Sequence, residues 1–99
     1  MGRYSYSALT TLNSPDIGTW IVTVYEADGG YYVVSDALGE HGYGATKTEA
    51  ARDFCESVMA YRAALECREA TLGPELTKHL ELIRRAEPRA TRLSVHAFA

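Results

Sequence analysis

A β-hairpin pattern in the first third of the chain constrains the fold more than any other sequence feature. Residues 19–26 (Thr-Trp-Ile-Val-Thr-Val-Tyr-Glu) are mostly β-branched or aromatic, and both alternating faces of such a strand are apolar or aromatic. Asp28, Gly29 and Gly30 follow, and these residue types accept the left-handed backbone of a tight turn. Residues 31–35 (Tyr-Tyr-Val-Val-Ser) then return as the antiparallel partner. The pattern therefore predicts a two-stranded hairpin at the centre of a sheet.

Two helices are expected after this hairpin. Thr46 and Glu49 have the spacing of a capping box, so a helix should run from about Thr48 to Thr71. Its apolar stripe, which would cover one sheet face, consists of Ala51, Phe54, Cys55, Val58, Tyr61 and Leu65. A second stripe of small residues would permit a close helix neighbour, and it consists of Ala60, Ala63, Ala64 and Cys67. The Gly-Pro pair at 73–74 ends this helix and begins another, which ends at Pro88. The apolar side of the second helix would be formed by Leu76, Leu80 and Ile83.

Further strands are predicted outside the central hairpin. Residues 4–9 alternate as a first strand that ends before the turn-forming cluster at 13–16. Residues 36–44 predict a glycine-rich loop with at most a short strand near Tyr43. Residues 92–98 alternate between apolar and polar side chains and predict a last strand. The fold class is therefore α+β, an antiparallel sheet of three to five strands with two helices packed on one face. The expected order is β-β-β-(β)-α-α-β.

Length and composition limit the classes of protein. Ninety-nine residues correspond to one domain, residues 1–99, and 46% hydrophobic residues are enough to build a core. No apolar run approaches 18 residues, and the N-terminus has no signal-peptide pattern, so we expect a cytoplasmic protein without membrane contact. Cys55 and Cys67 would lie about 18 Å apart on one helix, too far for a disulfide. No cysteine or histidine spacing typical of zinc is present, so no metal or cofactor is expected.

Charge is unevenly distributed along the chain. The net charge is −3, and residues 1–46 contain five acidic residues but one basic residue. Residues 78–99 are basic instead, and their arginines are a candidate patch for an anion or an acidic partner: Arg84, Arg85, Arg89 and Arg92. The other interpretation is a solvated helix end. A pI near 5.5 argues against direct nucleic-acid binding by the whole domain.

Candidate catalytic groups are few. The loop at 39–44 is rich in glycine, but its spacing matches no nucleotide-binding motif, and a turn explains the glycines better. His41 in this loop is either a surface histidine or a general base. Cys55 lies in mid-helix, away from the N-terminal turn that would lower its pKa. The sequence therefore predicts no catalytic residue and a non-enzymatic protein.

Tyrosine is unusually frequent, with seven residues in the chain. The helices of so short a chain can cover only one face of the sheet. The aromatic and apolar residues of the other face would therefore remain uncovered. They are either ordinary cross-strand pairs or a surface that contacts another chain, and a homodimer is expected in the second case. The candidate partner-binding residues are Tyr25, Tyr31, Tyr32, Ile21, His41 and Tyr43.

Several of these segments together resemble the HicB-like antitoxin domain. The matching stretches are Ile21–Glu26, Asp28–Ser35 and Gly42–Ala51, the last containing Thr-x-x-Glu-Ala at the start of the helix. The resemblance covers residues 19–67, and the strand expected at 92–98 fits the family's closing strand. It implies a domain that binds a small RNA-cleaving toxin and blocks its RNA-binding surface. The family's Pro-x-Leu-Pro-Gly segment is absent, and no separate DNA-binding module is expected.

The combined expectation is a protein-binding module of HicB-like type that covers a partner's functional surface. One alternative is an inhibitor, encoded by a phage or mobile element, that acts through an acidic surface on a host nucleic-acid-processing or defence complex. A second alternative is a small-ligand binder or an enzyme centred on the loop that contains His41.

Overall fold

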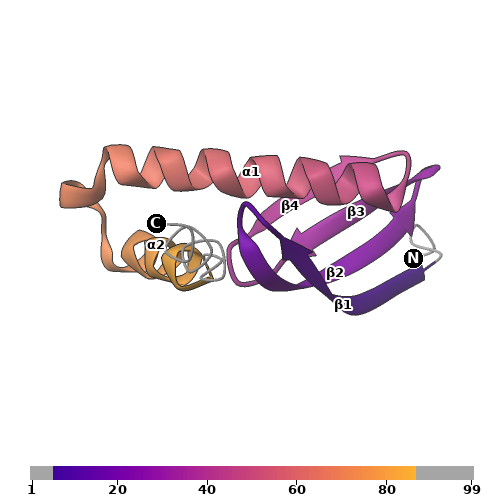
Figure 1. Ribbon diagram of the computed structural model, residues 1–99, viewed down its shortest axis with the longest axis horizontal. Coiled ribbons are helices and arrows are strands. Elements are labelled where there is room, and N and C mark those ends of the chain that lie inside the picture. The colour runs from indigo at the N-terminus through magenta and orange to yellow at the C-terminus, as the bar shows by residue number, and fades with distance from the viewer. Residues whose placement is uncertain (1–5, 87–99) are drawn as a thin grey trace, which may run out of the picture.

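The computed structural model describes residues 6–86, which form a four-stranded antiparallel sheet with two helices on one face (Figure 1). The strands lie side by side in chain order, and the elements are β1 (Tyr6–Ser14), β2 (Gly18–Ala27), β3 (Gly30–Ser35), β4 (Glu40–Gly44), α1 (Lys47–Cys67), a short 3-10 helix (Glu69–Thr71) and α2 (Pro74–Ala86). The α+β prediction is confirmed. The last strand expected at 92–98 lies outside the described residues.

The central hairpin forms through a two-residue turn. Ala27 lies opposite Gly30, and the two residues between them, Asp28 and Gly29, have φ angles of 54° and 78°. Two successive positive φ angles are typical of the hairpin turn whose twist matches that of the flanking strands. The resulting register places Tyr25 directly opposite Tyr32.

Two strand predictions are corrected by the structure. β1 continues past residue 9 and through Asn13 to Ser14, because Asn13 pairs with Thr19 and Ser14 with Gly18 of β2. The Thr19 hydroxyl donates to Asn13 Oδ1 at 2.7 Å, and Ser14 Oγ accepts from the backbone N–H of Asp16 at 3.0 Å. β4 is a full five-residue strand where the sequence predicts a loop with at most a short strand.

The core lies between the sheet and the helices. β2 and β3 contribute Trp20, Val22 and Val33, and the helices contribute Phe54, Val58, Leu65, Leu80 and Ile83. The predicted α1 stripe is therefore confirmed at its centre, since Phe54 and Val58 are fully buried. In Figure 1 the first half of α1 crosses the sheet, and its second half extends beyond the sheet over α2.

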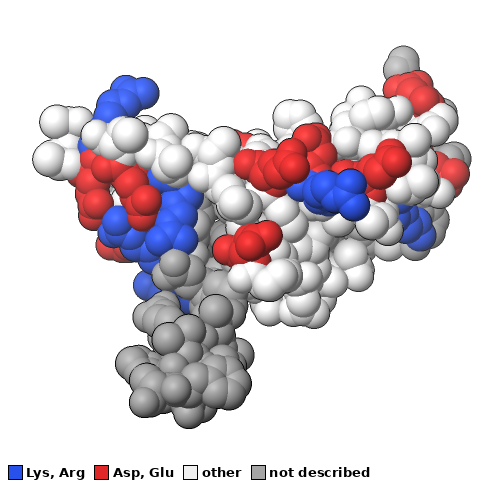
Figure 2. Space-filling view, turned by 45° about the horizontal axis from the view of Figure 1, so that its top comes forward, with Lys and Arg blue, Asp and Glu red and all other residues white. Residues whose placement is uncertain are grey.

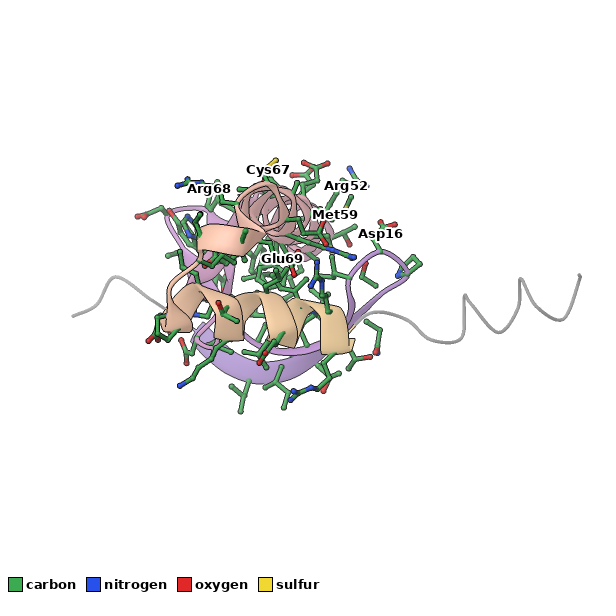
Figure 3. The ribbon with its side chains drawn as sticks, turned by 90° about the vertical axis from the view of Figure 1, so that its left-hand side faces the viewer. Asp16, Arg52, Met59, Cys67, Arg68 and Glu69 are labelled. Atoms are coloured by element: carbon green, nitrogen blue, oxygen red, sulfur yellow. The ribbon has the colours of Figure 1, made fainter. Side chains whose placement is uncertain are left out.

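The predictions for helix ends and helix packing need correction. α1 ends at Cys67, and the chain then tightens into the 3-10 helix. The stripe of small residues does not receive a neighbouring helix: Ala60, Ala63, Ala64 and Cys67 are all exposed. Figure 3 shows Cys67 on the side of α1 that faces away from α2. α2 packs through Leu80 and Ile83 instead, while Leu76 remains 39% exposed.

Two glycine contacts hold elements close together. At Gly42 of β4, a Cβ would come within 2.2 Å of the backbone nitrogen of Phe54, so α1 lies directly on this strand. At Gly18, where β2 begins with a φ of 84°, a Cβ would come within 1.5 Å of the carbonyl oxygen of Ala86. The end of α2 is thus seated on the first turn of the sheet. Within residues 6–86, neither helix has the length and hydropathy needed to cross a membrane.

Candidate functional site

The sheet face opposite the helices is the candidate site, and we call it the outer face. Directly paired residues on neighbouring antiparallel strands share a face, so the register defines its members. Nine residues form its central part: Leu9 and Thr11 of β1, Ile21, Thr23 and Tyr25 of β2, Tyr32 and Val34 of β3, and His41 and Tyr43 of β4. None of these nine side chains is buried, and none is Lys, Arg, Asp or Glu.

Three tyrosines form one row across the outer face. Tyr25 pairs with Tyr32, and Tyr32 pairs with Tyr43. The rings of Tyr32 and Tyr43 have centroids 4.7 Å apart and planes inclined by 51°. Gly30 makes room for this arrangement, because a Cβ there would come within 2.4 Å of the Tyr43 hydroxyl oxygen. The row is therefore a packed aromatic surface, and Tyr43 at its end is 41% exposed.

A second group on the outer face is aliphatic and more exposed. Leu9 is 73% exposed and Ile21 is 68% exposed. Leu9 pairs with Thr23, so Leu9 and Ile21 are diagonal neighbours across β1 and β2. Together with the tyrosine row they give the outer face large apolar groups on every strand.

The structure changes the membership of the predicted site. Tyr31 is half-buried on the opposite face, where it packs against the core and Lys47 Nζ lies 5.7 Å from its ring centroid. Tyr31 is therefore separated from Tyr25 and Tyr32. The sequence reasoning missed Leu9 and Val34. For Leu9 the missing information is the register of β1, which depends on the length of the turn before β2.

His41 lies on the outer face opposite Val34 and is exposed. It does not belong to a metal site in the described part of the chain, where no three residues of the types His, Cys, Asp and Glu form such a group. Cys55 is half-buried and Cys67 is exposed, and both are free thiols. Both thiols belong to α1, which covers the sheet face opposite the one on which His41 lies.

The edge of the sheet at β4 is closed by α1. The Thr46 hydroxyl accepts from the backbone N–H of Glu49 at 3.1 Å, which confirms the predicted N-cap. Glu49 in turn accepts from the backbone N–H of Ala45 at 3.0 Å. One turn further along, Asp53 Oδ2 accepts from the backbone N–H of Tyr43 at 2.9 Å. A donor of the outermost strand is thus satisfied by a carboxylate from α1.

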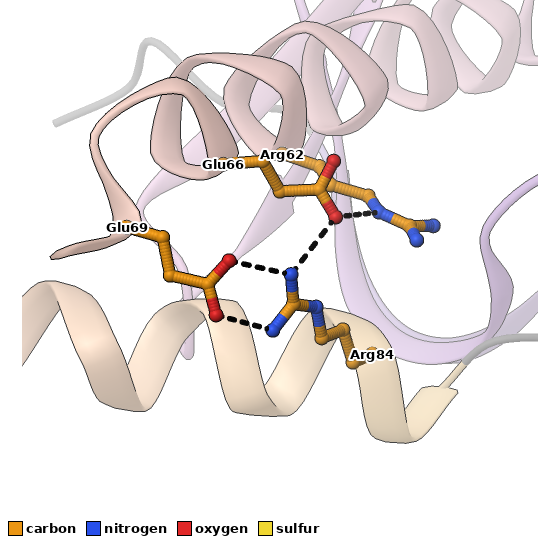
Figure 4. A network of polar contacts seen from close by, with 4 residues as sticks. All are labelled: Arg62, Glu66, Glu69 and Arg84. Carbon is orange, nitrogen blue, oxygen red and sulfur yellow. Dashed lines mark hydrogen bonds and ion pairs between the residues drawn. The ribbon is translucent and has the colours of Figure 1, made fainter.

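Of the predicted basic patch, Arg84 has partners inside the protein (Figure 4). Its guanidinium donates to both oxygens of Glu69, at 2.8 and 2.9 Å, and to Glu66 at 3.2 Å. These hydrogen bonds lower the pKa of Glu69, and bonds from Arg62 and then Arg84 lower the pKa of Glu66. The network joins the end of α1 to α2. Arg85 is exposed, and Arg89 and Arg92 lie outside the described residues.

A second polar contact joins the two helices. The Tyr61 hydroxyl of α1 and Nδ1 of His79 on α2 are 2.6 Å apart, and their rings meet edge-on. Burial, and secondarily the charge of Glu40, raises the pKa of Tyr61. Glu40 itself accepts a hydrogen bond from the Ser57 hydroxyl. This arrangement fixes the positions of β4, α1 and α2 relative to one another.

The acidic residues of the first half of the chain do not form one surface. Asp16 and Asp36 follow β1 and β3, whereas Asp28 follows β2, and alternate turns of an antiparallel sheet lie at opposite ends. Figure 2 shows one face of the molecule, where Asp and Glu side chains are interspersed with Lys and Arg along α1 and where the two helices meet. On the face that Figure 2 shows, the charges therefore form an ordinary mixed surface.

No family model matches the sequence, and no curated protein or solved structure shows significant similarity to it.

Proposed function

We propose that this protein is a non-enzymatic protein-binding module that covers a functional surface of its partner with the outer face. The observation that carries the proposal is the uncharged outer face itself, with a row of three tyrosines beside the exposed Leu9 and Ile21. Tyrosine is enriched at protein interfaces, because it adds a large contact area and a polar tip at low cost in rotamer entropy.

The chemistry of the outer face favours a protein over a nucleic acid. Proteins that bind single strands combine aromatic stacking with a positively charged groove along the backbone. None of the nine outer-face residues is a lysine or an arginine, so phosphate groups would find no basic partner among them. A polypeptide surface needs no such charges.

The resemblance to HicB-like antitoxins supplies the class of partner, a small RNA-cleaving toxin. In this proposal the outer face covers the toxin's RNA-binding surface, and the toxin is encoded next to this protein as a small basic chain. The acidic-surface inhibitor receives less support, because the turns separate Asp16 and Asp36 from Asp28. A site centred on His41 also receives less support, since both cysteines lie on α1, across the sheet from it.

The test uses the full chain as bait in an extract of its native host, with Ile21→Lys as the diagnostic variant. Ile21 is exposed, so the charge should leave the fold intact and abolish capture of the partner. Ala60→Lys, on the exposed side of α1, is the matched control and should retain capture. The captured protein should cleave RNA when purified, and added wild-type protein should suppress that cleavage. Equal capture by Ile21→Lys and wild type would contradict the proposed surface.

Replacement of Tyr25 and Tyr32 with Ser tests the tyrosine row separately. We expect the double variant to keep its thermal midpoint within a few degrees and to lose the partner. A variant that keeps both its stability and its partner would show that the tyrosines are ordinary cross-strand packing.

A further inference from the structure

The two edges of the sheet differ in how they are protected. Natural proteins protect edge strands by making them short, by placing charges or proline on them, or by covering them. β4 is five residues long, and Asp53 of α1 accepts from its Tyr43 backbone N–H. The β4 edge is therefore short, and α1 satisfies one of its backbone donors.

β1 has none of these protections in the described structure. It is nine residues long, pairs with β2 without a bulge from Tyr6 to Ser14, and contains no charged residue and no proline. Among the described elements, β2 is the only one with which β1 makes substantial contact. None of its side chains from Ala8 to Ser14 is buried. Within residues 6–86, no strand pairs with the side of β1 that faces away from β2.

We propose that β1 pairs antiparallel with β1 of a second copy, so that two sheets join into one of eight strands around a two-fold axis. The register centred on the strand's middle residue places Thr10 opposite Thr10 of the partner subunit and uses the whole length of β1. It also keeps the outer faces of both copies on the same side. This inference does not rest on the proposed function, since it uses the strand edge and not the outer face.

The composition of β1 favours a second copy as the occupant. Like charges placed directly opposite each other destabilise a strand pair, and an antiparallel strand paired with itself places equivalent positions at or near each other. β1 carries no charge, so self-pairing creates no such repulsion. Ala8 would lie opposite Leu12 of the partner subunit, and Leu9 opposite Thr11 of the partner subunit.

The closed edge at β4 determines the size of the assembly. A sheet with two long, unprotected edges can continue to add copies, whereas here one edge is the short β4, whose Tyr43 N–H donates to Asp53. After the two β1 strands pair, both outer edges of the joined sheet are β4 strands. The interface is isologous, and association ends at two copies.

Sedimentation of the full chain over a wide concentration range tests this interface. Wild type should sediment at twice its 10.9 kDa mass. Thr10→Lys and Thr10→Glu should each sediment as monomers with unchanged circular dichroism, because each places like charges opposite each other. An equimolar mixture of the two variants should restore the dimer, since opposite charges then meet at position 10. Ala60→Lys is the control for an added charge and should remain dimeric.

Three results would overturn the proposal. A wild type that is monomeric at every concentration would leave the β1 edge to another segment of this chain or to a different protein. A dimer whose dissociation constant is unchanged in both Thr10 variants would place the interface elsewhere. Monomeric variants that fail to combine when mixed would exclude the register centred on Thr10. By contrast, an Ile21→Lys variant that loses the partner but remains a dimer would show that the outer face and the β1 edge bind independently.

Discussion

The backbone nitrogen of Phe54 lies against Gly42, so closely that a Cβ on the glycine would come within 2.2 Å of it. This contact sets the distance between α1 and β4. Because backbone atoms form both sides of the contact, neither can move aside as a flexible side chain would.

Gly42→Ala should therefore destabilise the protein. We expect a loss of about 1–3 kcal/mol in the free energy of unfolding, the usual cost of adding a methyl group to a packed site. Gly73 is the control, because nothing lies within 4 Å of a Cβ there and its φ is not positive. Urea denaturation of both variants measures the difference. Equal stability would mean that α1 can move away from β4 at little cost.

Phe54 and Arg52 test the orientation of α1. Phe54 is fully buried, so Phe54→Ala should cost about 3–5 kcal/mol and largely unfold so small a domain. Arg52 is exposed on the opposite side of the helix (Figure 3), and Arg52→Ala should cost less than about 0.5 kcal/mol. Thermal denaturation of the two variants provides the comparison. Similar losses of stability would mean that the side of α1 that carries Phe54 is not the one packed against the sheet.

The Arg84 network predicts a specific dependence of stability on pH. Hydrogen bonds lower the pKa values of Glu66 and Glu69 below their ordinary value of 4.5. The stability they contribute is therefore present above that pH and is lost as the pH falls through the lowered pKa values. Arg84→Gln should be less stable than wild type at neutral pH, and the difference should disappear in acid.

Urea denaturation midpoints measured from neutral pH to below pH 4 would follow this change. Arg85→Gln is the matched control, since the described part of the chain shows no ion pair for Arg85 and its removal should leave the pH dependence as in wild type. If the stability difference between Arg84→Gln and wild type were the same at every pH, the hydrogen bonds of Arg84 would not affect the ionisation of Glu66 and Glu69.

The Tyr61 hydroxyl should ionise at a higher pH than that of an ordinary tyrosine. Burial, and then the charge of Glu40, raises its pKa above 10. An ultraviolet titration of the folded protein should show a phase above that value, and Tyr61→Phe should remove it. Loss of the contact with His79 should also cost about 0.5–1.5 kcal/mol. If the titration were unchanged in Tyr61→Phe, the phase at high pH would belong to another tyrosine.

Local sequence patterns predicted the central hairpin and the start of α1. The alternation of residues 19–26 and the Asp-Gly turn act over a few residues, as does the capping contact between Thr46 and Glu49. The core position of Phe54 likewise follows from helical spacing alone. These features need no knowledge of distant parts of the chain.

Features that depend on distant pairing were not predictable in the same way. Asn13 and Ser14 usually favour turns, but cross-strand and local hydrogen bonds keep them in β1. Strand alternation separates Tyr31 from Tyr32, but which of the two shares a face with Tyr25 depends on the length of the turn at 28–29. The membership of Leu9 likewise depends on the register of β1. The outer face was therefore predicted in part, with Tyr31 wrongly included and with Leu9 and Val34 missing.

The contact between Gly18 and Ala86 bears on how the chain folds as it is made. Synthesis delivers the β1–β2 hairpin first, yet the helix that rests on its turn is complete only after Ala86 has been added. During that interval Trp20 and Val22 lack their final cover and remain exposed to other nascent chains. A chaperone that shields the β1–β2 hairpin would therefore act before α2 is in place.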